Sequence, residues 1–168
     1  VIGILGIGTT PNAIAVLGDH AYVIDVGTDD LKVIDISDPA APTLAGNVGV
    51  GSVPSDVAVS GSHAYVVGNS SLKVIAVGDP NMPALVGTLG LGANPKSIAL
   101  NGVYAYVVDA VSGDLKVIDI SNPSMPTLAG SMVLGSSPRS IAIADAYACV
   151  IDSDSDDLKL IDISDPAV

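Results

Sequence analysis

Several residue types are missing from this chain of 168 residues. It has no Phe, no Trp and no Glu, so all 18 of its acidic residues are Asp. Asp is a poor helix former that favours turns and caps. Apolar residues make up 49% of the chain and are mostly Val, Ile, Ala and Leu, and the β-branched members of this set suit strands. The absences therefore disfavour helices and favour an all-β fold.

Basic residues are also scarce, since six Lys and Arg side chains give a formal net charge of −12. An acidic surface opposes binding to nucleic acid and to anionic lipid, because both need clustered Lys and Arg. No apolar run approaches the roughly 18 residues of a transmembrane helix, and no basic stretch precedes an apolar one at the start, as a signal peptide requires. The single Cys149 cannot form a disulfide within the chain. We expect no nucleic-acid partner and no membrane insertion.

The chain consists of four copies of one repeat, which begin at Pro11, Pro54, Pro95 and Pro138, at intervals of 43, 41 and 43 residues. Each copy holds four β-like runs separated by turn residues; in the first copy these are residues 13–16, 21–25, 31–36 and 43–50. The first two runs are almost entirely apolar, which is typical of strands buried on both faces. The fourth is rich in Gly, as an outer edge strand can be.

Four antiparallel strands form a small sheet that cannot bury both of its faces alone, so the copies must stack face to face. Radial stacking around an axis gives a β-propeller, whereas linear stacking gives a β-solenoid. We predict a single β-propeller domain over residues 1–168, with four four-stranded blades at about residues 11–51, 54–92, 95–135, and 138–168 together with 1–8.

The two ends of the sequence predict how the ring closes. The fourth copy lacks its last strand, and residues 1–8 (VIGILGIG) resemble the strand that ends the other copies. We therefore expect residues 1–8 to complete the last blade by pairing with residues 158–163. The same spare strand serves a four-bladed monomer or a dimer in which two chains exchange these strands and form one eight-bladed ring, and the sequence leaves both open.

Three segments carry a family resemblance: LKVIDISDP (residues 31–39), LKVIDISNP (115–123) and LKLIDISDP (158–166). With the preceding HAYVID or YAYVVD stretch and the Pro-rich tails at 39–46 and 123–130, they resemble the LVIVD-type propeller repeat family. The second copy departs from this pattern at Ala76 and Gly78. The resemblance covers the whole chain and implies a propeller in an extracellular or cell-surface setting. It implies no catalytic activity.

One residue follows the first Pro of each copy, and we call these four the rim residues because a propeller places them around its axial opening: Asn12, Ser55, Lys96 and Arg139. Lys96 and Arg139 fall in neighbouring copies. Two cations at one rim can hold an anion such as a carboxylate or a sugar acid, or they can pair with nearby Asp residues. The rim residues are our candidate ligand-binding site.

A repeated Asp ends the second run of three copies, at Asp25, Asp109 and Asp152. In the second copy it becomes Gly68, and the link to the following Lys shortens by two residues. Because Asp and loop length are lost together, we predict that this Asp caps its own loop or pairs with that Lys.

Acidic residues also crowd the last copy, at Asp152, Asp154, Asp156 and Asp157. Oxygen-rich loops suit calcium, but this one lacks the Gly and the distal Glu of an EF-hand. It is a weak metal candidate, and we expect no other cofactor. The sequence has no nucleophile elbow, no phosphate-binding Gly loop and no CxxC pair, and it gives no catalytic residue.

These observations favour a non-catalytic binding or interaction module whose ligand is a protein or a carbohydrate, used as a monomer or a homodimer. A second hypothesis is a structural or assembly unit, either a strand-exchanged eight-bladed dimer or a fragment of a longer repeat array. A third is an enzyme with a site in the axial pocket. It is disfavoured because the repeated positions hold similar residues, while a catalytic site needs unlike groups.

Overall fold

The computed structural model describes residues 1–51, 53–92, 94–135 and 137–166, and these residues form an all-β protein. They contain 15 strands and no helix, and so no helix long and apolar enough to cross a membrane. The strands fall into four sheets that correspond to the four copies of the repeat. The predicted all-β propeller architecture is confirmed.

Each blade is built from corresponding strands. The first strands are β1 (Pro11–Leu17), β5 (Pro54–Ser60), β9 (Pro95–Asn101) and β13 (Pro138–Ala144). The second strands are β2 (His20–Asp25), β6 (His63–Gly68), β10 (Tyr104–Asp109) and β14 (Tyr147–Asp152). The third strands are β3 (Asp30–Asp35), β7 (Ser71–Ala76), β11 (Asp114–Asp119) and β15 (Asp157–Asp162). The fourth strands are β4 (Thr43–Gly49), β8 (Ala84–Gly90) and β12 (Thr127–Val133).

Within a blade the strands pair antiparallel in sequence order, so each blade is a meander. We name them blade one (β1–β4), blade two (β5–β8), blade three (β9–β12) and blade four (β13–β15). The second and third strands are almost fully buried in the first three blades, while β4, β8 and β12 are largely exposed edge strands. The second strands of these blades and the outer fourth strands have the expected burial, but the first strands do not, since β1 is largely exposed and β13 is only partly buried.

The tight turn after each first strand explains one recurrent residue. Gly18, Gly61 and Gly102 occupy its first position with φ between 55° and 58°, in the left-handed region that favours Gly. Blade four has Asp145 there, with φ of 52°. Asp tolerates this conformation better than most residues because its short side chain bonds locally.

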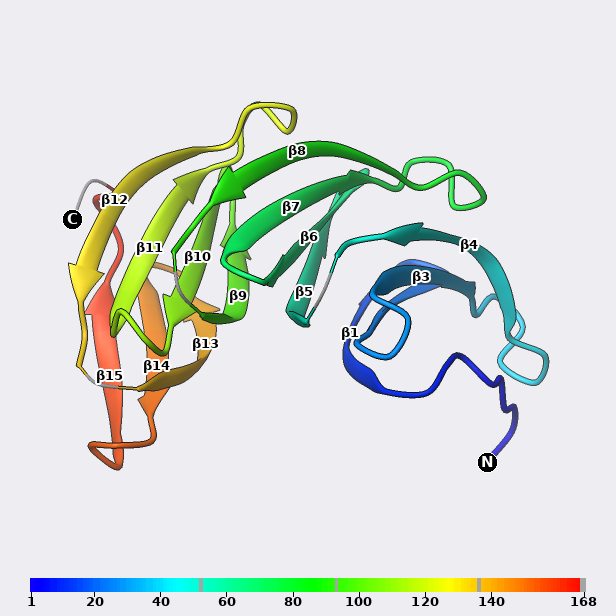
Figure 1. Cartoon of the computed structure of the whole chain (residues 1–168), viewed down its shortest axis with the longest axis horizontal. Helices are drawn as coiled ribbons and strands as arrows, with labels where there is room; N and C mark the ends of the chain where they lie inside the picture. Colours follow the sequence, from blue (N-terminus) through cyan, green and yellow to red (C-terminus); the bar gives the residue numbers. More distant parts are fainter. Residues whose placement is uncertain (52, 93, 136, 167–168) are drawn as a thin grey trace.

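The blades stack through three hydrophobic cores, each formed between two neighbouring blades. The first strands line up side by side, β1 against β5, β5 against β9 and β9 against β13. Figure 1 shows the result as an arch, with β5 and β9 on its inner side and β4, β8 and β12 along its outer side. The buried side chains between the blades are mostly Val, Ile, Leu and Ala, as the composition predicts, and each core also contains one buried Tyr.

The described residues of a single chain do not show the predicted closure. Blade four has only three strands, and residues 1–8 belong to no strand. They lie beside blade one, at the opposite end of the arch from β15 (Figure 1). The arch is open, so β15 lies far from the segment expected to complete its sheet (Figure 1).

Candidate functional site

The rim residues lie at the second position of the four inner strands β1, β5, β9 and β13, at corresponding ends of neighbouring blades. The repeated Asp residues lie at the same end, because Pro11 is opposite Asp25 and Pro95 is opposite Asp109 in the sheet register. The structure therefore brings together the two sets of residues that the sequence singled out.

Asn12 serves the contact between blades. Its side-chain Nδ2 donates hydrogen bonds to the carbonyl oxygen of Ser55 at 2.9 Å and to that of Pro54 at 3.3 Å. These bonds join blade one to blade two at the inner edge. The Asn12 side chain and the Ser55 carbonyl are thus engaged in a contact between blades, which the sequence did not reveal.

Lys96 and Arg139 differ from the other rim residues. Lys96 is half-buried, and its ammonium makes no ion pair or hydrogen bond within the part of the chain that the structure describes. Arg139 is exposed, and its Nε donates a hydrogen bond of 3.1 Å to the Ser153 hydroxyl. Neither cation pairs with a carboxylate of the described residues, so both keep charge available to a ligand.

Three of the four other Lys residues contrast with these two. Lys116 pairs with Asp114 at 2.5 Å, and Lys159 pairs with Asp157 at 2.5 Å. Lys32 pairs with Asp30 and lies 3.7 Å from Asp25. Each of these ammonium groups is held by acids of its own hairpin.

The repeated Asp is a buried structural group, as the sequence predicted. Asp109 accepts amide hydrogen bonds from Asn94 at 2.9 Å, from Val111 at 2.9 Å and from Ser112 at 3.1 Å. Asn94 belongs to the link between blades, while Val111 and Ser112 belong to the hairpin loop. The carboxylate thus fixes two loops at once, and Asp25 does the same through Thr9, Thr10 and Gly27.

These hydrogen bonds lower the pKa values of the carboxylates. Burial acts to raise the pKa of Asp109, but amide hydrogen bonds from Ser112, Asn94 and Val111 and the charge of Lys116 outweigh it, so the pKa lies below the usual value. The pKa values of Asp25 and Asp152 are lowered against burial by the same kinds of partner. All three remain ionised at neutral pH.

Blade two departs from this arrangement at Gly68. A Cβ on Gly68 would lie 2.4 Å from the carbonyl oxygen of Val53 and 2.6 Å from Cα of Pro54, so no side chain fits there. Ser71 also replaces the Asp that pairs with the Lys of the other three blades, so among the described residues Lys73 donates only to the Ser71 hydroxyl, at 3.4 Å. Burial lowers the pKa of Lys73.

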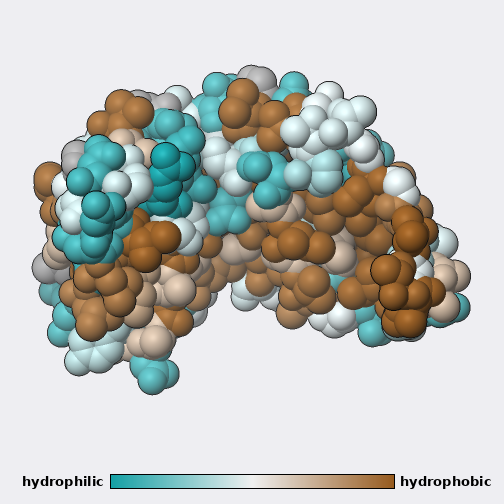
Figure 2. All heavy atoms as spheres, turned by 90° about the horizontal axis from the view of Figure 1, so that it is seen from below, coloured by the Kyte–Doolittle hydropathy of each residue, from teal (hydrophilic) through white to brown (hydrophobic). Residues whose placement is uncertain are grey.

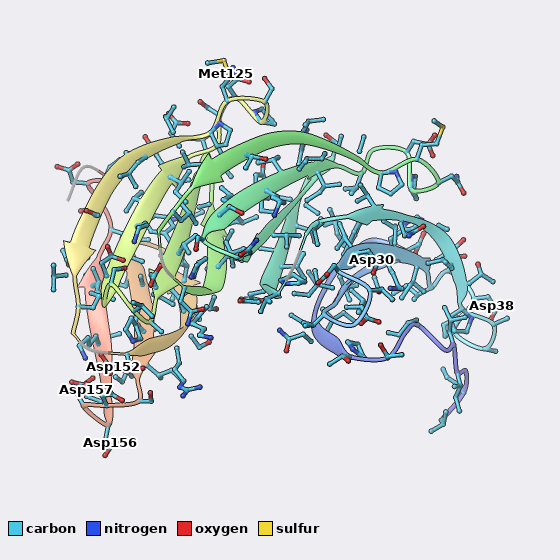
Figure 3. All side chains as sticks on the ribbon, viewed as in Figure 1. Asp30, Asp38, Met125, Asp152, Asp156 and Asp157 are labelled. Atoms are coloured by element: carbon cyan, nitrogen blue, oxygen red, sulfur yellow. The ribbon has the colours of Figure 1, made fainter. Side chains whose placement is uncertain are left out.

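The acidic loop at residues 152–157 does not form a cation cage. Asp152 accepts bonds from the amides of Asp154 and Ser155 and from Lys159, and Asp157 accepts from Lys159 and from the Ser155 hydroxyl. Figure 3 shows Asp156 pointing away from the other two labelled acids of this loop. No cluster of three or more His, Cys or Asp side chains suited to a metal ion occurs among the described residues.

Two residues that the sequence analysis missed also join blades. Asp56 Oδ2 accepts hydrogen bonds from the Ser97 hydroxyl at 2.8 Å and from the Ile98 amide at 3.0 Å. The Ser97 hydroxyl in turn lies 3.5 Å from the amide of Ile141, in blade four. The available signal was polarity, because Asp56 and Ser97 occupy one repeat position directly before the apolar run of their strands.

A hollow opens at the opposite end of the inner strands from the rim residues. A cavity of about 510 Å³ lies between blades three and four and is lined by residues that include Asn101, Tyr104, Tyr106 and Asp145. Asn101 crosses it by donating a hydrogen bond of 3.0 Å to the carbonyl oxygen of Asp145. This cavity lies away from the rim residues.

The comparisons with known proteins agree with this fold. The LVIVD repeat matches four successive stretches, residues 9–50, 51–89, 92–133 and 135–168. No curated protein matches the chain.

Solved structures show the same architecture. The computationally designed Ika4 protein is 17% identical, with a TM-score of 0.80 and 98% of each chain covered. The computationally designed Ika8 protein is 17% identical, with a TM-score of 0.74, and the match covers 91% of this chain but 46% of that one. A Bacteroides uniformis protein provisionally named a 6-phosphogluconolactonase is 16% identical, with a TM-score of 0.79, and coverage is 90% and 50%. The chain thus spans about half the length of the latter two proteins, and the likeness shows the fold alone.

Proposed function

This chain belongs to the LVIVD repeat family, and on that basis we propose that it is a non-catalytic propeller scaffold that acts as a binding module through its rim. One observation carries the proposal: Lys96 and Arg139 lack a carboxylate partner among the described residues, while Lys32, Lys116 and Lys159 are ion-paired. In a chain of net charge −12 with six basic side chains, unpaired cations on neighbouring inner strands are a conspicuous feature.

The chemistry of these two side chains defines the ligand class. A guanidinium and an ammonium recognise carboxylates, the first through a planar fork and the second as a point charge. We infer an acidic group on a protein or an acidic carbohydrate as the ligand, in the extracellular or cell-surface setting that the family resemblance implies.

Catalysis finds less support in the arrangement. The Ser62 hydroxyl lies 3.2 Å from Nδ1 of His63, which superficially resembles a nucleophile with its base. However, the two are adjacent residues of an exposed turn, and the residue opposite His63 in the sheet is Ala76, where blade one has Asp35 opposite His20. No acid is therefore placed across the strand from His63 to orient its ring.

An array of acidic and neutral oligosaccharides tests the proposal. The wild-type chain is expected to bind glycans that contain uronic acid. The Lys96→Ala/Arg139→Ala variant is expected to bind these glycans at least about ten-fold more weakly, since two charge-assisted bonds are removed. The control is Asn81→Asp/Ser124→Asp, which reaches the same net charge by changing exposed residues of outer loops. Equal retention by all three proteins, or retention of neutral glycans alone, would refute the rim as the acidic-ligand site.

A further inference from the structure

The three inter-blade cores share one composition. The side of blade one that faces blade two contributes buried residues that include Tyr22, Ile24, Leu31 and Val33. Blade two contributes Val57, Ala64, Val66, Ile75 and Val77, and the end of the outer strand of blade one adds Val48 and Val50. The cores between blades two and three and between blades three and four repeat these positions.

A fourth core of this kind is present in two separate halves. At one end of the arch, Leu5 and Ile7 pack on Ala21, Val23 and Ile34 of blade one. This matches the way that Val48 and Val50 pack on blade two.

At the other end of the arch, the corresponding face of blade four is uncovered. Ile151, Leu158 and Leu160 are 51%, 61% and 69% exposed. Their counterparts in blade one, Ile24, Leu31 and Val33, are all 0% exposed. Figure 2 shows hydrophobic residues gathered at both ends of the arch.

Residues 1–8 already sit in the position of an outer strand. A Cβ on Gly46 would lie 2.6 Å from the Pro80 carbonyl oxygen of the next blade, and one on Gly87 would lie 2.1 Å from that of Pro123. Gly3 makes the same close approach to Pro39 of blade one. The segment is therefore placed as the fourth strand of a blade whose first three strands are not beside it.

An apolar hollow lies next to the segment, on the side of blade one that faces away from blade two. A cavity of about 240 Å³ lies against blade one, lined by residues that include Ile7, Pro11, Ala13, Ile14 and Val23. Its lining is mostly apolar, and Ile14 is 63% exposed. Three strands with an apolar face are thus missing at one end of the arch, and a three-stranded blade with an unpaired edge and an exposed apolar face stands at the other.

We propose that two copies of this chain join end to end into one eight-bladed ring, in which residues 1–8 of each copy pair with β15 of the other. Both new contacts continue the series of interfaces already formed three times within the chain. The four blades superpose on about half of two longer chains. A head-to-tail contact closes into a ring when its rotation fits and otherwise grows into a filament.

The ring completes the inner hydrogen bonds as well. The Ser97 hydroxyl lies 3.5 Å from the Ile141 amide across one blade interface. Ser140 and Ile14 are the repeat counterparts of Ser97 and Ile141 at the two ends of the arch. In the ring, Ser140 of one copy faces Ile14 of the other.

Light scattering on a sizing column tests this proposal with matched variants. The wild-type chain is expected at twice 16.6 kDa. Leu160→Asp is expected to raise the dimer dissociation constant on the order of 100-fold or more, because it buries a carboxylate without a partner in both contacts. Met125→Asp is the control, since Met125 is also 69% exposed but lies on an outer loop, away from both ends of the arch (Figure 3).

A mixing experiment separates lost assembly from misfolding. Leu5→Asp damages the other half of the same contact, so it is also expected to be monomeric. Mixing Leu5→Asp with Leu160→Asp leaves one of the two contacts intact in a mixed dimer, and mass is expected to return to twice 16.6 kDa. A wild-type mass of 16.6 kDa, a wild-type open polymer, or a Leu160→Asp dimer as tight as wild type would overturn the proposal.

Discussion

The Ser97 hydroxyl donates a hydrogen bond of 2.8 Å to Asp56 Oδ2, and it thereby ties blade three to blade two at the inner edge of the arch. The same oxygen accepts the Ile98 amide at 3.0 Å. Asp56 and Ser97 are counterparts in the repeat, so one position provides an acceptor in one blade and a donor in the next. Contact between blades is therefore polar at the inner edge and apolar in the sheet interior.

This relationship predicts the effect of Asp56→Ala. The change leaves the Ser97 hydroxyl and the Ile98 amide without their charged acceptor, and we expect the free energy of unfolding to fall by about 1.5–3 kcal/mol. The control is Asp154→Ala, because the exposed Asp154 carboxylate accepts no hydrogen bond from the described residues. Urea denaturation of both variants measures the difference, and equal midpoints would contradict this role of Asp56.

The repeated Asp predicts acid sensitivity. The pKa of Asp109 is lowered in the folded chain, while an unfolded Asp titrates near about 3.9. The unfolded state therefore binds more protons at acidic pH, so this stability is present above about pH 4 and is lost as the pH falls through the folded pKa. Denaturation midpoints between about pH 7 and pH 3 are expected to fall less steeply for Asp109→Asn than for wild type. Parallel curves for the two proteins would contradict it.

Lys73 and Lys116 occupy one repeat position, but we expect replacement by Met to affect the free energy of unfolding differently at the two residues. Lys116→Met leaves the buried Asp109 and the mostly buried Asp114 without their cation, and we expect a loss of about 2–4 kcal/mol in unfolding free energy. Lys73 has no such acid, and its pKa is lowered by burial. Lys73→Met is therefore expected to leave stability unchanged or raised. Equal losses in thermal unfolding would show that the acid partner is irrelevant.

We expect Gly68→Asp, which introduces the Asp found at this position in the other blades, to lower the stability of the fold. The new Cβ would lie 2.4 Å from the Val53 carbonyl oxygen, so the backbone must move, and we expect a loss of about 1–3 kcal/mol or more. Gly49→Asp is the control, because no atom lies within 4 Å of a Cβ there. Comparison of melting temperatures checks this prediction, which fails if Gly68→Asp melts with or above the control.

Much of the fold could be predicted because it depends on the repeat. Runs of apolar residues and turn residues place the strands to within one or two positions, and the joint loss of Asp and loop length at Gly68 revealed the structural role of Asp25, Asp109 and Asp152. Ring closure could not be predicted in this way. The rotation between blades follows from how the side chains of two sheets fill the space between them, and no local pattern encodes it.

The site shows the same division. Each rim residue follows the first Pro of its copy, and all four lie at the same end of the inner strands. The sequence could not show that Asn12 faces a carbonyl of the next blade, because that contact depends on the stacking. Cys149 is only half-buried, whereas its repeat counterpart Tyr22 is buried. The outer face of blade four is uncovered in this structure, so the repeat position alone does not bury it.

Hydrogen exchange of the backbone amides tests most directly the claim that residues 1–8 of one copy pair with β15 of another. In the ring, amides that bond across this new contact are protected, and we expect slow exchange in residues 1–8 and along β15. We expect this protection to disappear in the Leu160→Asp variant while blade two stays protected. Fast exchange in residues 1–8 of the wild-type chain, at concentrations where β6 and β7 are fully protected, would contradict the account.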